Sequence, residues 1–180
     1  MRILLIGCGG IGSWLCHFLA FGRRNSLLPI NTSITVADPD VVEARNLLYS
    51  NFEAQDVGMN KAAVLASRYS YICSPKEMKS SKELEPYDIV LVATDNARSR
   101  KMVYESGKHW IDMRCKGDLW AVFTSDNRKA AKDFKPKGKD LNISGQSCQF
   151  EADLASRNVK FGCLMAAGAG YQKLLSLVVM

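Results

Sequence analysis

The feature that most constrains the fold is a glycine-rich turn directly after a short apolar run. Residues 2–6 read Arg-Ile-Leu-Leu-Ile, and Gly7-Cys8-Gly9-Gly10-Ile11-Gly12 follows at once. A continuous apolar run of this kind is typical of a buried parallel strand. Glycines between such a strand and a helix permit a tight turn and a close approach of the backbone to phosphate groups. The pattern therefore predicts a nucleotide-binding turn made by Gly7, Gly9, Gly10 and Gly12.

A helix and a second strand complete the unit around this turn. Apolar residues at helical spacing predict a helix over residues 11–22, and residues 33–37 alternate as a strand that ends at Asp38. Strand, turn, helix and strand form a βαβ unit, and its right-handed crossover brings the glycine turn and Asp38 to the same edge of the sheet. There Asp38 can accept hydrogen bonds from a ribose hydroxyl, which suits NAD and ATP equally well.

The rest of the chain continues the alternation of strands and helices. We expect helices over residues 59–71, 97–106 and about 159–178, and strands over 89–93, 110–113 and 119–124. This order predicts an α/β fold, a Rossmann-like doubly wound, mostly parallel sheet with helices on both faces. Nothing marks a second domain, so we interpret residues 1–180 as a single nucleotide-binding domain.

Residues 126–147 form a polar stretch that interrupts this pattern. We expect a mobile basic loop there, because so long a connection is uncommon in a compact domain and is usually functional or mobile. Its charges would either be solvated or dock an acidic partner or a polyanion. Nothing in the stretch suggests base stacking, so no nucleic-acid partner is predicted. The basic residues are Arg128, Lys129, Lys132, Lys135, Lys137 and Lys139.

Neither a leader nor a membrane span nor a zinc site is predicted. The apolar run before the glycines is too short for a leader, and Gln172 and Lys173 interrupt the apolar C-terminal segment. The 6 cysteines are scattered without a CxxC pair, which favours buried thiols over zinc ligands. We therefore expect a cytoplasmic protein without a membrane partner and without zinc.

Three further segments follow the glycine turn in a recognisable order. They are Asp38-x-Asp40-x-Val42-Glu43-x-x-Asn46-Leu47, then Asp56-Val57-Gly58-x-x-Lys61-Ala62, and finally Thr94-Asp95-Asn96 followed by Arg100. Together with the glycines, they resemble the ThiF/MoeB/HesA type of adenylyltransferase, the ubiquitin-activating-enzyme-like proteins. The resemblance runs from residue 3 to about residue 112, and the chain looks like a short, minimal member.

The resemblance implies Mg-ATP-dependent adenylation of a carboxylate, most commonly the C-terminus of a ubiquitin-like protein or peptide, by a homodimer. The carboxylate attacks the α-phosphate, pyrophosphate leaves, and an acyl-adenylate remains. Two anions must meet, so cations are needed at the phosphates. By resemblance Asp95 is the Mg²⁺ ligand, Lys61 contacts the phosphates as a point charge, and Asn46 faces them. The cofactor-binding residues implied beyond the glycines are Asp38, Asp40, Lys61 and Asn96.

One position departs from the family pattern. An arginine usually follows the asparagine by three residues, and Tyr49 stands there in this chain. A tyrosine supplies no fixed positive charge. Residues 45 and 49 would share a face if the segment were α-helical, so we expect Arg45 to take over as a catalytic cation. The alternative is a catalytically weak or inactive module that binds ATP or a partner without turnover.

Two other interpretations stay open. A thioester-forming cysteine would be Cys148, in or after the basic stretch, or Cys115, whose neighbours Arg114 and Lys116 could lower the pKa of its thiol. An NAD(P)-dependent oxidoreductase would account for the glycines and Asp38. It would leave Lys61 and Asp95 without a role.

Overall fold

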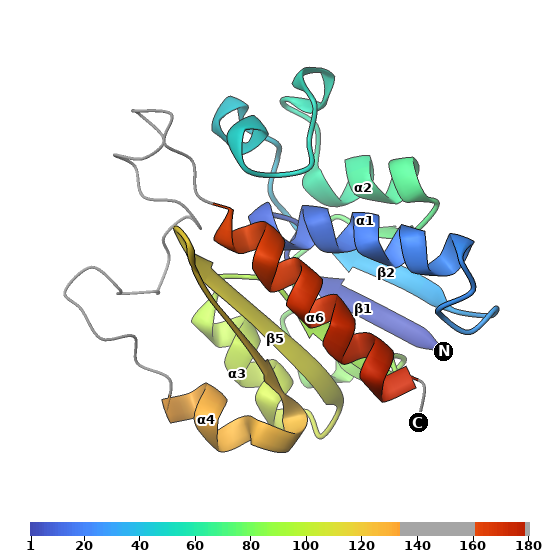
Figure 1. Ribbon diagram of the computed structural model, residues 1–180, viewed down its shortest axis with the longest axis vertical. Helices are drawn as coiled ribbons and strands as arrows, with labels where there is room; N and C mark the ends of the chain where they lie inside the picture. The colour runs from blue at the N-terminus through green and yellow to red at the C-terminus, as the bar shows by residue number, and fades with distance from the viewer. Residues whose placement is uncertain (134–160, 179–180) are drawn as a thin grey trace.

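A six-stranded sheet forms the centre of the molecule in the computed structural model, which describes residues 1–133 and 161–178 (Figure 1). The strand order is β3-β2-β1-β4-β5-β6. Neighbouring strands from β3 to β5 run parallel, and β6 pairs antiparallel with β5. The strands are β1 (Arg2–Ile6), β2 (Ser33–Ala37), β3 (Ile72–Ser74), β4 (Ile89–Val92), β5 (His109–Lys116) and β6 (Leu119–Thr124).

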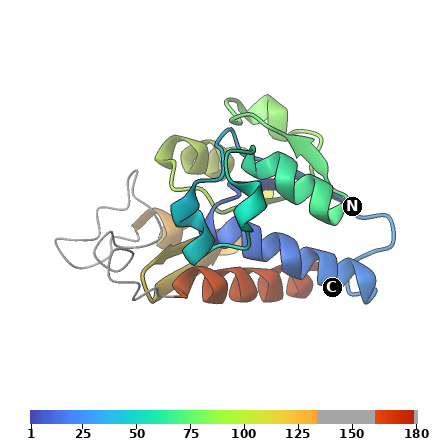
Figure 2. The ribbon, with the colours of Figure 1, turned by 90° about the horizontal axis from the view of Figure 1, so that it is seen from above.

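Helices cover both faces of this sheet, as predicted (Figure 2). The helices α1 (Gly10–Arg24), α2 (Lys61–Tyr69) and α6 (Gly162–Val178) pack on one face, around a core that contains Leu15, Leu65 and Leu174. The helices α3 (Ala97–Glu105) and α4 (Arg128–Asp133) pack on the other face, around Val103 and Ala131. The mostly parallel α/β prediction is therefore confirmed.

The strand β1 shows why its sequence is apolar throughout. Ile3 and Leu5 belong to the core on the α1 face, whereas Leu4 and Ile6 belong to the core on the α3 face. Successive side chains of a strand point to opposite faces, and both faces are covered here, so every position is buried. A strand with only one covered face would alternate between apolar and polar residues.

The strand order reverses beside β1, and this reversal positions the site. From β1 the chain moves outward through β2 to β3, and then returns to the other side of β1 as β4. The carboxyl ends of β1 and β4 therefore lie side by side, while the helix after β1 packs on one face of the sheet and the helix after β4 packs on the other. The backbone N–H of Ala93 donates to the carbonyl of Ile6 at 2.8 Å, and that of Gly7 donates to Ala37 at 2.9 Å. Such a reversal is where ligands bind in open α/β sheets.

Element boundaries differ from the prediction where local capping decides them. Helix α2 begins at Lys61 rather than at residue 59, because Asn60 caps it, and it ends at Tyr69, because Ser70 adopts a left-handed conformation. Strand β3 was not predicted at all. It has three residues, lies at the sheet edge and pairs with β2 alone, so its sequence carries no strand period.

The predicted basic loop is wrong in its first part. Residues Ser125–Asn127 form a 3₁₀ turn and Arg128–Asp133 form α4, because Ala131 packs into the core on the α3 face. Residues 134–147 lie outside the described residues, as do the first two residues of the predicted final helix, which is described from Gly162. Among the helices of the described ranges, none has the length and apolar character to cross a membrane.

Candidate functional site

The glycine turn between β1 and α1 combines two structural glycines with an open helix end. A Cβ on Gly7, whose φ is +93°, would lie 2.7 Å from backbone atoms of Ala93 and Thr94. A Cβ on Gly12 would lie 1.9 Å from the carbonyl oxygen of Gly7. A Cβ on Gly9 would meet no atom of residues 1–133 or 161–178 within 4 Å. Gly7 and Gly12 thus permit the close packing of the turn, while Gly9 leaves the N-terminus of α1 open.

This helix N-terminus is suited to an anion. The first turn of α1 contains no acidic residue, and its N-cap residue is Gly9, which has no side chain with which to cap the helix. Its backbone N–H groups and the positive end of the helix dipole therefore face outward without a protein counter-charge from the helix itself. This arrangement is the usual basis of phosphate binding.

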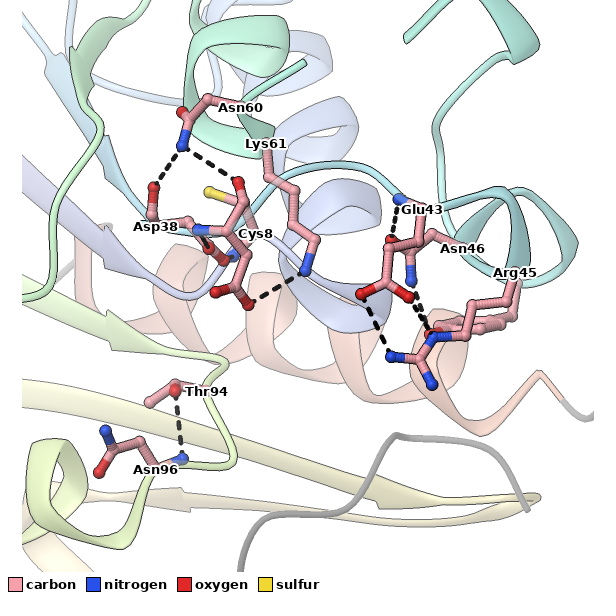
Figure 3. A network of polar contacts seen from close by, with 11 residues as sticks. Cys8, Asp38, Glu43, Arg45, Asn46, Asn60, Lys61, Thr94 and Asn96 are labelled. Atoms are coloured by element: carbon pink, nitrogen blue, oxygen red, sulfur yellow. Dashed lines mark hydrogen bonds and ion pairs between the residues drawn. The ribbon is translucent and has the colours of Figure 1, made fainter. Parts of the chain in front are cut away.

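Asp38 links the glycine turn to the segment that follows β2. Its carboxylate is buried and accepts hydrogen bonds from the backbone N–H of Cys8 at 2.6 Å and of Asp40 at 2.8 Å. Burial raises the pKa of Asp38, and the two backbone hydrogen bonds oppose that rise. The side chain therefore holds the turn in place, and both its oxygens are engaged with the backbone in this structure (Figure 3).

Asn60 is the central residue of the site that sequence reasoning missed. Its Nδ2 donates to the carbonyls of Asp38 and Asp40, each at 3.0 Å, and its Oδ1 accepts from the N–H of Ala63. The backbone N–H of Lys61 also donates to Asp40 at 2.9 Å. Asn60 thus caps α2 and ties the start of α2 to the end of β2. An asparagine just before an apolar helical run is an N-cap signal that could have found it.

Replacing Asn60 with alanine is expected to lower the free energy of unfolding by about 2 kcal/mol, through the loss of the cap and of two side-chain hydrogen bonds. Urea unfolding followed by circular dichroism measures this change. Asn60→Asp keeps the capping oxygen and removes both amide donors, so it separates the two contributions. Equal stability of Asn60→Ala and the wild-type protein would show that the tether contributes nothing.

Lys61 occupies the first turn of α2 with its ammonium at the site. The ammonium lies 3.2 Å from the carboxylate of Asp40. The side chain of Lys61 is only 11% exposed, whereas that of Asp40 is 67% exposed. An ion pair with so exposed a partner is weak, because solvent screens it. The buried stem therefore fixes the position of the ammonium, while Asp40 can be exchanged for a stronger anion such as a phosphate.

Asp95 and Asn96 are neighbours in the segment after β4, but their side chains have different surroundings. Asn96 is the N-cap of α3, its Oδ1 accepting from Arg98 and Ser99 and its Nδ2 donating to Glu77 at 2.9 Å. Its side chain is thus engaged in capping in this structure. Asp95 is exposed, and within the described ranges its carboxylate accepts no hydrogen bond and forms no ion pair.

Asp95 fits a magnesium ion that is shared with a nucleotide. Mg²⁺ is commonly held by one or two carboxylates together with phosphate oxygens and water. Asp95 is exposed and follows β4, the strand that pairs with β1, so it can provide one such carboxylate. In the part of the chain that the structure describes, no group of three or more histidine, cysteine, aspartate or glutamate residues could hold a metal. The residues therefore suit a nucleotide-bound Mg²⁺ rather than a site built entirely by the protein.

The segment around Asn46 corrects the reasoning about Arg45. Residues Ala44–Leu48 form a 3₁₀ helix rather than an α-helix. With three residues per turn, residue 46 aligns with residue 49, and the Nδ2 of Asn46 donates to the hydroxyl of Tyr49 at 2.9 Å. Arg45 is exposed and pairs with Glu43, with 2.6 Å between Nε and Oε2. The premise that residues 45 and 49 share a helical face is therefore wrong.

Tyr49 lies against the first turn of α1. Its side chain is buried, and its ring atoms lie 3.1–3.2 Å from where a Cβ on Gly10 would be. The carbonyl of Tyr49 accepts from the indole N–H of Trp14 at 3.0 Å and from the thiol of Cys163 at 3.1 Å. The residue that replaces the usual arginine is thus built into the packing between the 3₁₀ segment and α1.

The argument for Cys115 is wrong in its geometry, and Cys148 lies outside the described residues. Neighbouring residues of a strand point to opposite faces of the sheet. Cys115 belongs to the core on the α1 face, whereas Arg114 reaches Asp112 and Ala131 on the α3 face. The cationic neighbours in sequence therefore point away from the thiol of Cys115.

The chain is similar in sequence and in structure to several known proteins. The model of the ThiF family matches residues 1–175. Ubiquitin-like modifier-activating enzyme 6 of Homo sapiens is 27% identical over 145 residues, which cover 69% of this chain and 12% of that protein. The structure of E. coli MccB with MccA-N7isoASN matches with a TM-score of 0.66 and 19% identity, covering 98% of this chain and 56% of that chain. That of E. coli MccB with ATP gives 0.62 and 19%, covering 98% and 55%.

The chain therefore spans about half the length of these solved relatives and a small part of the curated one. The solved structures support the fold assignment.

Proposed function

The chain belongs to the ThiF family, and we propose that it binds Mg-ATP where the glycine turn meets α1 and activates a carboxylate as an acyl-adenylate. The observation that carries the proposal is the meeting of three features at one sheet edge. They are the open N-terminus of α1, the positioned ammonium of Lys61 and the exposed carboxylate of Asp95. A matching structure of E. coli MccB was determined with ATP, which supports the proposal that this chain binds a nucleotide.

Each residue of the site has a defined task in this proposal. The N-terminus of α1 receives the phosphates, and Lys61 exchanges Asp40 for a phosphate oxygen. Asp38 and Asp40 border the ribose. Asn46, whose buried side chain accepts from the N–H of Glu43 and donates to Tyr49, holds the 3₁₀ segment that lies beside the phosphates. Asp95 would hold Mg²⁺, which when bound neutralises charge on the phosphate oxygens. Negative charge grows on those oxygens as the carboxylate attacks, so these groups stabilise the transition state more than the ground state.

The carboxylate that we propose is the C-terminus of a protein or peptide. This choice is supported by the MccA-N7isoASN present in one matching structure and by the name of the human relative. A ubiquitin-like protein is the more specific form of the proposal. Homodimerisation and a thioester at a cysteine remain predictions.

Exchange of radioactive pyrophosphate into ATP, measured with a panel of peptides carrying free or amidated C-termini, tests the proposal. Exchange that requires a free carboxylate supports adenylation. Tight binding of NADH that ATP does not displace would contradict the proposal and favour an oxidoreductase. ATP binding without exchange supports the second candidate, a non-catalytic module, which the presence of Tyr49 in place of arginine favours.

Although the 3₁₀ turn does not align Arg45 with Tyr49, Arg45 is still the cation that we propose for the missing charge, and Arg45→Ala is expected to slow pyrophosphate exchange by about tenfold. Because its guanidinium pairs with exposed Glu43 on the surface, its loss should change stability by less than about 1 kcal/mol. Steady-state exchange rates measure the effect, and Arg98→Ala is the matched control at an exposed arginine. An unchanged exchange rate in Arg45→Ala would eliminate Arg45 as the replacement.

A further inference from the structure

A buried polar cluster lies between β5 and α3, the helix that begins shortly after Asp95. Asp112 of β5 is fully buried, and its carboxylate accepts a hydrogen bond from the Nε of Arg114 at 2.7 Å and another from the hydroxyl of Tyr104. The Nε of Arg100 lies 3.3 Å from its other oxygen, as an ion pair rather than a hydrogen bond. One carboxylate therefore holds three side chains in the interior.

Two of these three side chains belong to the same face of α3. Arg100 and Tyr104 are four residues apart, which places them one above the other on the helix. Asn96, which caps α3, is four residues before Arg100, and the N–H of Arg100 donates to the carbonyl of Asn96 at 3.1 Å. The ring of Tyr104 also stacks on Trp110 of β5 at 4.5 Å. Asp112 thus fixes α3 on the sheet along the face that contains the cap.

The sheet register brings this cluster to the end of β4. Asp112 pairs with Val92, the last residue of β4, and Asp95 follows Val92 by three residues. Asp95 also directly precedes the cap of α3. The position of Asp95 is therefore set by the end of β4 on one side and by the start of α3 on the other. Asp112 pairs with the last residue of β4 and contacts two side chains of α3.

The side chains of the cluster keep their protonation states over the physiological pH range. Burial lowers the pKa of Arg114, but the carboxylate of Asp112 and the hydroxyl of Tyr104 more than offset this, so its pKa stands above the ordinary value. Burial, reinforced by the charge of Asp112, raises the pKa of Tyr104. The arginine stays charged and the tyrosine stays a donor across the physiological range. Removing the carboxylate would leave Arg100 and Arg114 without this buried counter-ion, which is costly.

We propose that Asp112 is a positioning residue for Asp95: by anchoring Arg100 and Tyr104 it sets the start of α3 and thereby the carboxylate that takes Mg²⁺ with the nucleotide. The inference rests on the proposed function, because Asp95 has a metal to hold only if the site binds Mg-ATP. When a residue that holds a metal ligand in position is replaced, the affinity for the metal typically falls by about tenfold or more.

Calorimetric titration of ATP, with Mg²⁺ and in EDTA, tests the inference without relying on turnover. In the wild type Mg²⁺ should tighten ATP binding, and Asp95→Asn should abolish that gain. Asp112→Asn should reduce the gain by about tenfold and leave affinity in EDTA unchanged. In the Asp95→Asn background, Asp112→Asn should cause no further loss of ATP affinity, because Asp112 acts through Asp95.

Hydrogen–deuterium exchange provides the structural readout. The amides of Arg98 and Ser99 donate to the side chain of Asn96, so they report on the start of α3. They should exchange about tenfold faster in Asp112→Asn, while the amide of Ala63, capped by Asn60, stays unchanged. Tyr104→Phe carries the same test if Asp112→Asn does not fold, because its ring can still stack on Trp110. Lys101→Ala, an exposed change on the same helix that leaves both reporter amides in place, is the control.

The possible failures are distinguishable. Equal loss of ATP affinity with and without Mg²⁺, or a further loss in the Asp95→Asn background, would make Asp112 a general stability residue and overturn the inference. So would a wild type in which Mg²⁺ does not tighten ATP binding. A wild type that binds no ATP at all would overturn the proposed function itself.

Discussion

Replacing Lys61 with methionine is expected to slow pyrophosphate exchange by about 10²–10³-fold, the usual cost of removing one charge that stabilises a transition state. Methionine keeps the apolar stem of this largely buried side chain and removes only the ammonium. The ion pair that is lost has an exposed partner, Asp40, so the free energy of unfolding should fall by less than about 1 kcal/mol. Exchange kinetics and urea unfolding of the same preparation measure both quantities.

The control for this prediction is Lys82→Met, which removes an exposed lysine from the 3₁₀ turn Ser81–Leu84. It alters the net charge in the same way as Lys61→Met, but at a surface with no role in the proposed site. If both variants exchanged pyrophosphate at the wild-type rate, Lys61 would not contact the phosphates. If both lost activity equally, the effect would belong to net charge rather than to position.

The second large effect is expected at Gly12. A methyl group there would lie 1.9 Å from the carbonyl oxygen of Gly7, and a backbone atom cannot move aside as a flexible side chain can. Gly12→Ala should therefore lower the free energy of unfolding by about 3 kcal/mol, which corresponds to a fall in Tm of about 10 °C for a domain of this size. Thermal unfolding followed by circular dichroism measures the shift.

Gly9→Ala is the matched variant in the same turn. A methyl group on Gly9 would meet no atom of the described part of the chain within 4 Å, and its φ of −76° is open to alanine. Stability should therefore change by less than about 1 kcal/mol. The methyl group would instead occupy the space in front of α1 and weaken ATP binding in calorimetry. Equal Tm values for Gly9→Ala and Gly12→Ala would contradict the division of roles between these glycines.

Much of the fold could be predicted because its signals are local. The apolar run of β1, the glycine turn and the helical spacing of α1 are contiguous in sequence, and they are confirmed as strand, turn and helix. The prediction placed Asp38, Lys61 and Asp95 after a strand or at a helix start, and the structure has them there. The parallel order of the sheet followed from the alternation of elements, because a crossover of constant hand leaves few alternatives.

The failures have two physical reasons: the deciding contact either joins residues that are distant in sequence or depends on the type of helix that forms. The spacing of residues 45 and 49 suggests an α-helical pair, but a 3₁₀ turn pairs Asn46 with Tyr49 instead. The charges beside Cys115 suggested an activated thiol, but strand alternation turns them to the other face. The basic run after residue 126 suggested a loop, but the burial of Ala131 makes its first part a helix.

The sequence by itself determined the glycine turn and the helix starts at Lys61 and Ala97, because glycines and capping residues have local preferences. Tertiary structure alone decided how α3 is held on the sheet. Asp112 is the clearest case, since it is one aspartate in a strand until the sheet register sets it opposite Val92 and the packing of α3 brings Arg100 and Tyr104 onto it. Those contacts join separate elements, and no spacing in the chain encodes them.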